Sequence, residues 1–134
     1  MSDPVITDML RVAKAALERF HDVEVGDDGA ITFAHGGVLC VVQGTTLEEG
    51  LPVLNLTCVV AWDLPFESDV PTRVALGVGE GLFGTPRVIR GERGWDVTLR
   101  YAFPAVGLAE HPMGTLLMLV VSSASSMRAE LVDG

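Results

Sequence analysis

The chain has 134 residues, 49% of them hydrophobic and 20% charged, and its 18 acidic against 9 basic residues give a formal net charge of −9. This length fits one domain with its own core, and the composition excludes a disordered chain. Because an acidic surface repels phosphate groups, we expect neither nucleic acid nor an anionic membrane as a partner.

The first half of the chain predicts one helix followed by strands. Residues 3–20 place apolar side chains at helical spacing after a capping residue, Asp3, and Pro4. Short apolar segments separated by glycine-containing turns come next. They predict four strands, at residues 23–25, 30–35, 38–43 and 51–64.

The last of these strands has two fairly apolar faces, which is typical of a central strand that is partly covered on both sides. One predicted face carries Leu54, Leu56, Cys58, Val60 and Trp62. The opposite face carries Val53, Asn55, Thr57, Val59 and Ala61. Cys40 and Cys58 lie inside apolar strands, so we expect buried free thiols.

The second half predicts a helix, a hairpin and a closing helix. Residues 69–78 have helical spacing but lead into a glycine-rich segment. A strand at residues 86–90 is joined by a glycine-containing turn to a strand at residues 95–103. In the latter strand large apolar side chains alternate with smaller or polar ones, which predicts one buried face that includes Trp95, Leu99 and Tyr101. Residues 112–132 predict the last helix.

These elements predict a single α+β domain over residues 1–134. We expect one antiparallel sheet of about five or six strands with helices packed on one face, in the order α-β-β-β-β-α-β-β-α.

The chemically reactive residues do not form a recognisable catalytic or metal-binding pattern. His21, His35 and His111 lie at separate element boundaries, whereas a zinc site needs three or four converging ligands. The serines near the C-terminus lie far in sequence from any histidine, and the glycine run at residues 77–84 follows a helix instead of a buried strand. We therefore expect no catalytic residue, no metal, no cofactor and no enzymatic activity.

The layout resembles the YbjN-like family and the related type III secretion chaperones, and is most similar to actinobacterial peptide-binding chaperone-like proteins. The resemblance rests on the first amphipathic helix to Phe20, the acidic turn Gly26-Asp27-Asp28-Gly29, strand Ile31-Thr32-Phe33, the segment Trp95-Asp96-Val97-Thr98-Leu99-Arg100-Tyr101-Ala102-Phe103 and the helix from Pro112. It spans most of the chain but includes no diagnostic short motif. It implies a cytoplasmic, secretion-chaperone-like fold that forms dimers and holds extended peptide segments without chemistry.

A sheet covered on one face leaves its other face free for a peptide, held by side-chain pockets or by strand addition at an edge. The predicted peptide-binding residues on that face are Val53, Asn55, Thr57, Val59, Thr98 and Arg100. We expect a non-enzymatic, chaperone-like domain with a protein or peptide client, acting as a homodimer. The alternatives are a small-molecule-binding or enzymatic domain with a pocket between sheet and helices, and a purely structural subunit.

The expected location is the cytoplasm. The N-terminus lacks a basic segment followed by an apolar stretch. The apolar run at residues 116–121 is shorter than the roughly 20 residues that span a bilayer. We therefore expect no membrane association.

Overall fold

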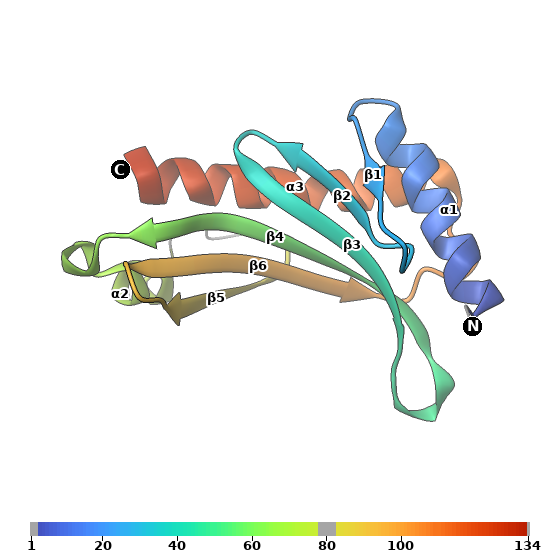
Figure 1. Ribbon diagram of the computed structural model, residues 1–134, viewed down its shortest axis with the longest axis horizontal. Coiled ribbons are helices and arrows are strands. Elements are labelled where there is room, and N and C mark those ends of the chain that lie inside the picture. The colour runs from blue at the N-terminus through green and yellow to red at the C-terminus, as the bar shows by residue number, and fades with distance from the viewer. Residues whose placement is uncertain (1–2, 78–82, 134) are drawn as a thin grey trace.

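The computed structural model describes residues 3–77 and 83–133 (Figure 1). Three α-helices and six strands follow one another in the predicted order, with two short 3-10 turns at Glu48–Gly50 and Phe66–Ser68. The helices are α1 (Pro4–Glu18), α2 (Val70–Ala75) and α3 (Glu110–Asp133). The strands are β1 (Glu24–Val25), β2 (Ile31–His35), β3 (Val38–Thr46), β4 (Pro52–Leu64), β5 (Thr85–Arg90) and β6 (Trp95–Phe103).

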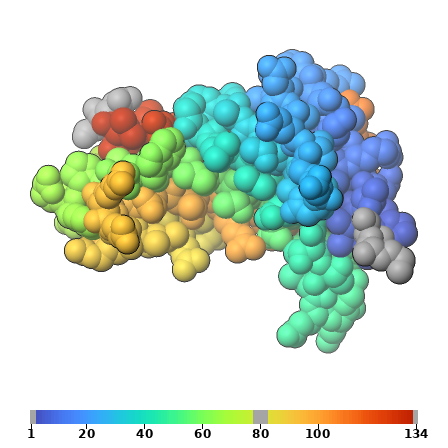
Figure 2. All heavy atoms as spheres, in the orientation of Figure 1, coloured from blue at the N-terminus to red at the C-terminus, as the bar shows by residue number. Residues whose placement is uncertain are grey.

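The six strands form one antiparallel sheet in the order β1-β2-β3-β4-β6-β5. This arrangement confirms the predicted α+β class, the single antiparallel sheet and the order of its elements. β4 is the longest strand and lies between β3 and β6. This position inside the sheet is the one that its two apolar faces indicate. The hairpin between β3 and β4 projects from the body of the molecule (Figures 1 and 2).

The helices α1 and α3 pack on one side of the sheet. The side chain of Asp3 accepts a hydrogen bond of 2.8 Å from the amide of Val5, so the predicted cap starts α1. α3 contacts β4 and β3, and α1 contacts both α3 and the same two strands. The core between these layers includes Leu17 from α1, Leu56 and Leu99 from the sheet, and Leu117 and Met127 from α3.

Gly44 allows α1 to approach β3 closely. A Cβ atom at this position would overlap the Cγ2 methyl group of Ile6 on α1. Gly44 pairs with Leu54 of β4, so both residues face the helices. Side chains alternate along a strand, and Val53, Asn55, Thr57 and Val59 therefore lie on the face away from α1.

β4 departs from regular pairing at its C-terminal end, and the predicted face assignment is wrong there. The register with β6 shifts between Val59 and Ala61 and again before Leu64. Val60 and Ala61 are consequently both buried, whereas Trp62, predicted on the face of Leu54 and Val60, is 54% exposed. A bulge of this kind inserts extra residues and inverts the alternation beyond it.

Arg128 of α3 holds this irregular segment. Its Nη1 donates a hydrogen bond of 3.0 Å to the carbonyl oxygen of Val60, and its guanidinium carbon lies 5.5 Å from the centre of the Trp62 ring. The carbonyl oxygen of Val60 thus receives a charged donor, and the exposed indole of Trp62 packs on the same guanidinium group.

The alternation of β6 is largely confirmed, because Val97, Leu99 and Phe103 are buried and Tyr101 is half-buried. Trp95 is also half-buried and packs edge-to-face on Phe66, with ring centres 5.6 Å apart. The guanidinium of Arg90 lies 4.3 Å from the centre of the Phe66 ring and covers this corner.

The second helix is shorter than the predicted residues 69–78. α2 ends at Ala75, because Leu76 leaves the helical region and Gly77 follows with a φ of 99°. The glycine-rich continuation at residues 78–82 lies outside the described residues. α2 is nonetheless tied to α3, since Nη2 of Arg73 donates to the carbonyl oxygen of Glu130 at 2.7 Å.

By length and composition alone, Glu110–Val132 of α3 would be sufficient to cross a membrane. The core helix of a globular domain passes the same test, and α3 buries Met113, Leu117, Val120, Ala124 and Met127 in this one.

Replacing Arg128 with methionine should lower the free energy of unfolding by about 1–3 kcal/mol, because the Val60 carbonyl loses its donor while the packing volume is kept. Urea denaturation measures the change. Arg11→Met is the matched control, since that exposed guanidinium pairs with Asp8 of its own helix, and its effect should stay within about 0.5 kcal/mol. Equal losses in the two variants would contradict the role given to Arg128.

Replacing Gly44 with alanine should destabilise the protein by about 1–3 kcal/mol, because α1 must move away from the new methyl group. In an Ile6→Ala background the same change should be much less harmful, since the opposing methyl group is gone. A double-mutant cycle monitored by thermal or urea unfolding tests this coupling. Additive effects of the two substitutions would mean that Ile6 does not set the requirement for glycine.

Candidate functional site

The face of the sheet that points away from α1 and α3 carries no helix in the described parts of the chain. We call it the open face. Strand pairing aligns two rows of side chains across β3, β4, β6 and β5. The first row is Leu39, Val59, Thr98 and Arg87, and the second is Val41, Thr57, Arg100 and Thr85. Figure 2 shows strand atoms from β3 (teal) to β5 (yellow) at the surface, with α3 (red) visible at the upper edge.

The structure brings four of the six predicted peptide-binding residues together at the centre of the open face. Thr57 lies directly opposite Arg100, and Val59 directly opposite Thr98. Thr57, Val59 and Thr98 are half-buried and Arg100 is exposed. These four residues therefore form one accessible patch.

The other two predicted residues lie on the same strand face but nearer the projecting hairpin. Val53 is 2% exposed and Asn55 is 8% exposed. They consequently offer a ligand almost no surface in this chain.

Sequence reasoning missed four members of these two rows. Leu39 (45% exposed) and Val41 come from β3, and Thr85 and Arg87 come from β5. Arg87 lies diagonally across the β5–β6 ladder from Arg100, a relation that places Cβ atoms about 7–8 Å apart. The alternation in Thr85-Pro86-Arg87-Val88 was the available signal, but the pairing of β5 with β6 had to be known to place Arg87 beside Arg100.

Two exposed arginines lie on the open face, although the chain is acidic and Glu24 of β1 lies on the same face of the sheet. Arg87 and Arg100 are both exposed, and neither takes part in the three ion pairs found among the described residues. The acid on the same face of β6, Asp96, is half-buried, and its Oδ1 accepts a 3.0 Å hydrogen bond from the amide of Asp63. Two guanidinium groups are thus available to a ligand carboxylate.

Neither edge of the sheet is well suited to adding a further strand. The edge strand β1 has two residues, which is too short for an extended ladder. The opposite edge strand β5 contains Pro86, which has no amide hydrogen, together with two charged residues, Arg87 and Arg90. Short edges, proline and charge are the features by which proteins block edge pairing. Of the two binding modes expected from the sequence, the open face is therefore favoured over strand addition.

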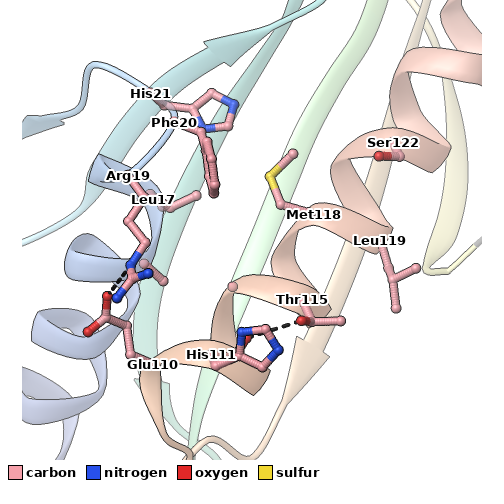
Figure 3. A pocket seen from close by; sticks show the side chains of 12 residues that line it. Leu17, Arg19, Phe20, His21, Glu110, His111, Thr115, Met118, Leu119 and Ser122 are labelled. Carbon is pink, nitrogen blue, oxygen red and sulfur yellow. Dashed lines mark hydrogen bonds and ion pairs between the residues drawn. The ribbon is translucent and has the colours of Figure 1, made fainter.

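A groove of about 580 Å³ lies on the other side of the molecule, between the end of α1 and the first half of α3 (Figure 3). We call it the helix groove. Its lining is Ala16, Leu17, Arg19, Phe20, His21, Glu110, His111, Gly114, Thr115, Met118, Leu119 and Ser122. An ion pair of 2.6 Å between Arg19 Nε and Glu110 Oε1 closes one end. In Figure 3, Phe20 and Met118 extend into the space between the two helices.

A second hollow of about 720 Å³ lies between α1 and the turn that joins β1 to β2. Several of its charged side chains are engaged locally. Arg11 pairs with Asp8 at 2.7 Å, Lys14 with Glu18 at 3.4 Å, and Asp28 accepts a hydrogen bond from the amide of Ala30. This hollow is the nearest match to the pocket between sheet and helix expected for a small-molecule site, but its polar groups do not converge on one point.

Two histidines that are separated in sequence meet beside the helix groove. Nε2 of His21 lies 3.1 Å from Nδ1 of His35, and His21 also packs edge-to-face on Phe33. The pair supplies two nitrogen ligands, whereas a protein zinc site takes three or four. Across residues 3–77 and 83–133, no group of three His, Cys, Asp or Glu side chains is placed to hold a metal ion.

The two cysteines are buried and directly opposite each other on β3 and β4, as free thiols. A hydrogen-bonding interaction with the Cys58 side chain, together with burial, raises the pKa of the Cys40 thiol above its ordinary value. A thiol kept neutral is a poor nucleophile, so these residues belong to the core and not to a reactive site.

No family model and no curated protein matches this chain.

In the native protein at pH 8, Cys40 and Cys58 should fail to react with a thiol reagent such as DTNB, and both should react once urea unfolds the chain. Fast labelling of the native protein would contradict the burial of the pair.

Because the folded pKa of Cys40 is raised, its contribution to stability is present below the ordinary thiol pKa of about 8.5 and is lost as the pH rises above it. Cys40→Ala should accordingly show a flatter loss of stability between pH 8 and 10.

Proposed function

We propose that the chain is a non-enzymatic, chaperone-like domain that holds an extended peptide segment of a client protein on its open face. The observation that carries this proposal is the patch of accessible Thr57, Val59, Thr98 and Arg100, which two rows of neighbours extend over four strands. Such a mixture of apolar, hydroxyl and cationic groups suits a peptide with alternating side chains.

The dimensions of the patch indicate how much peptide it holds. Four strands spaced about 4.8 Å apart span roughly 14 Å, and an extended chain advances about 3.3 Å per residue. A peptide that crosses the strands therefore places about four or five residues on the open face. Contact through so few side chains gives modest affinity, which fits a chaperone that must release its client.

The two arginines on the open face favour an acidic client segment. Arg87 and Arg100 are diagonal neighbours, so both guanidinium groups can reach one carboxylate. The apolar neighbours Leu39, Val41 and Val59 suit the apolar residues that flank such an acid. We propose a client segment in which acidic and apolar side chains alternate.

We further propose a homodimer that acts in the cytoplasm, and membership of the YbjN-like, secretion-chaperone-like group. The chain-wide pattern described above and the α+β fold support this kinship. A small-molecule-binding or enzymatic role is the alternative. It has the volume of the second hollow in its favour, but Arg11, Lys14 and Asp28 are already bonded to neighbours in their own segments.

A matched pair of fluorescently labelled peptides tests the proposal. One alternates valine with glutamate, and the other alternates valine with lysine. The acidic peptide should bind more tightly in fluorescence anisotropy. The double variant Arg87→Gln, Arg100→Gln should bind it at least about thirtyfold more weakly, since each of the two lost charged contacts is worth about 1 kcal/mol or more.

Arg93→Gln is the matched control, because it removes the same charge from the exposed turn between β5 and β6. It should leave the affinity unchanged. Equal binding of both peptides would reject the acidic preference while keeping the peptide-binding role. If neither peptide binds at high protein concentration, the peptide-binding role itself is rejected.

A further inference from the structure

We infer that the helix groove is the seat of a second copy of this chain, with Phe20 of each copy inserted into the groove of the other. This inference rests on the proposed homodimer but not on client binding, and it assigns the dimer to the face opposite the one proposed for the client.

The groove and its rim expose an unusual amount of apolar surface for helices of a core. Phe20 is 80% exposed and Leu119 is 41% exposed, with Met118 half-buried between the two helices. α3 buries one face against the sheet, yet these residues continue its apolar character onto the other side. A helix that is apolar on more than one side is usually covered on more than one side.

Charge narrows the identity of the covering molecule. Residues 112–127 of α3 include no charged side chain, although the chain carries a net charge of −9. The formal charges among the groove-lining residues are those of Arg19 and Glu110, which are bonded to each other and sum to zero. Two copies of an acidic chain repel each other, and this repulsion is smallest when they meet through a surface without net charge. A basic partner would gain no electrostatic attraction from such a surface.

The shape of the surface fits a two-fold axis. A symmetric dimer uses the same patch on both subunits, so a projecting group and the hollow that receives it must lie on one face. Phe20 and the groove of about 580 Å³ satisfy this condition side by side. A buried aromatic side chain at the centre of an interface is the type of residue that dominates binding.

Sedimentation velocity and light scattering test the inference. At about 100 µM, well above a micromolar Kd, the wild-type protein should be a dimer. Phe20→Glu and Leu119→Glu should each weaken dimerisation by at least about thirtyfold, because each two-fold interface then buries two new acids. Leu76→Glu is the matched control, since this residue is 82% exposed at the end of α2, and it should remain dimeric.

Salt provides a second readout that does not depend on any substitution. Screening the mutual repulsion of two acidic copies should strengthen the dimer as the salt concentration rises, whereas it should weaken the binding of an acidic peptide to Arg87 and Arg100. A wild-type protein that stays monomeric would overturn the inference together with the homodimer. A dimer that survives Phe20→Glu and Leu119→Glu but is lost in Val59→Glu would place the interface on the open face and overturn the inference alone. Circular dichroism of each variant confirms that it is folded.

Discussion

The packing of α3 along the central strand β4 is the contact on which the rest of the structure depends. It buries one face of the helix against β4 and β3, and α1 completes the same layer where Gly44 allows Ile6 to approach. With both long helices on one side, the reverse side of the sheet is left open by the described parts of the chain. The division of the surface into an open face and a helix groove follows from this one-sided covering.

The open face and the helix groove differ in their local charge, and this difference matters because the chain as a whole is acidic. Contact between macromolecules is easiest where the local charge is neutral or opposite to that of the partner. The formal charges of the helix groove cancel, because Arg19 and Glu110 form an ion pair. The open face carries Arg87 and Arg100, which form no ion pair with the residues that the structure describes. We therefore assign like-with-like association to the first surface and an acidic client to the second.

Local patterns predicted the elements well, and long-range contacts explain the errors. The alternation from Trp95 to Phe103 gave the bounds of β6, since one buried face dictates period two along a regular strand. The same reasoning failed at Trp62, because the register shift in β4 is stabilised by Arg128, which is far away in sequence. The helix predicted to residue 78 stops at Ala75, since Gly77 adopts a positive φ that spacing alone does not reveal.

In the candidate surfaces too, local patterns predicted some residues, and long-range contacts determine the others. Thr57, Val59, Thr98 and Arg100 could be grouped because β4 and β6 are neighbours, whereas the burial of Val53 and Asn55 and the position of Arg87 depend on tertiary structure. The helix groove joins segments from opposite ends of the chain, so no local motif indicates it. The sequence does contain one indication of the helix groove, which is the uncharged stretch at residues 112–127. A helix that faces water usually carries charged or polar side chains on that side. Between residues 112 and 127 the exposed polar side chains are uncharged, as in Ser122 and Ser126, and the exposed Leu119 lies among them, which favours cover of this side by a partner.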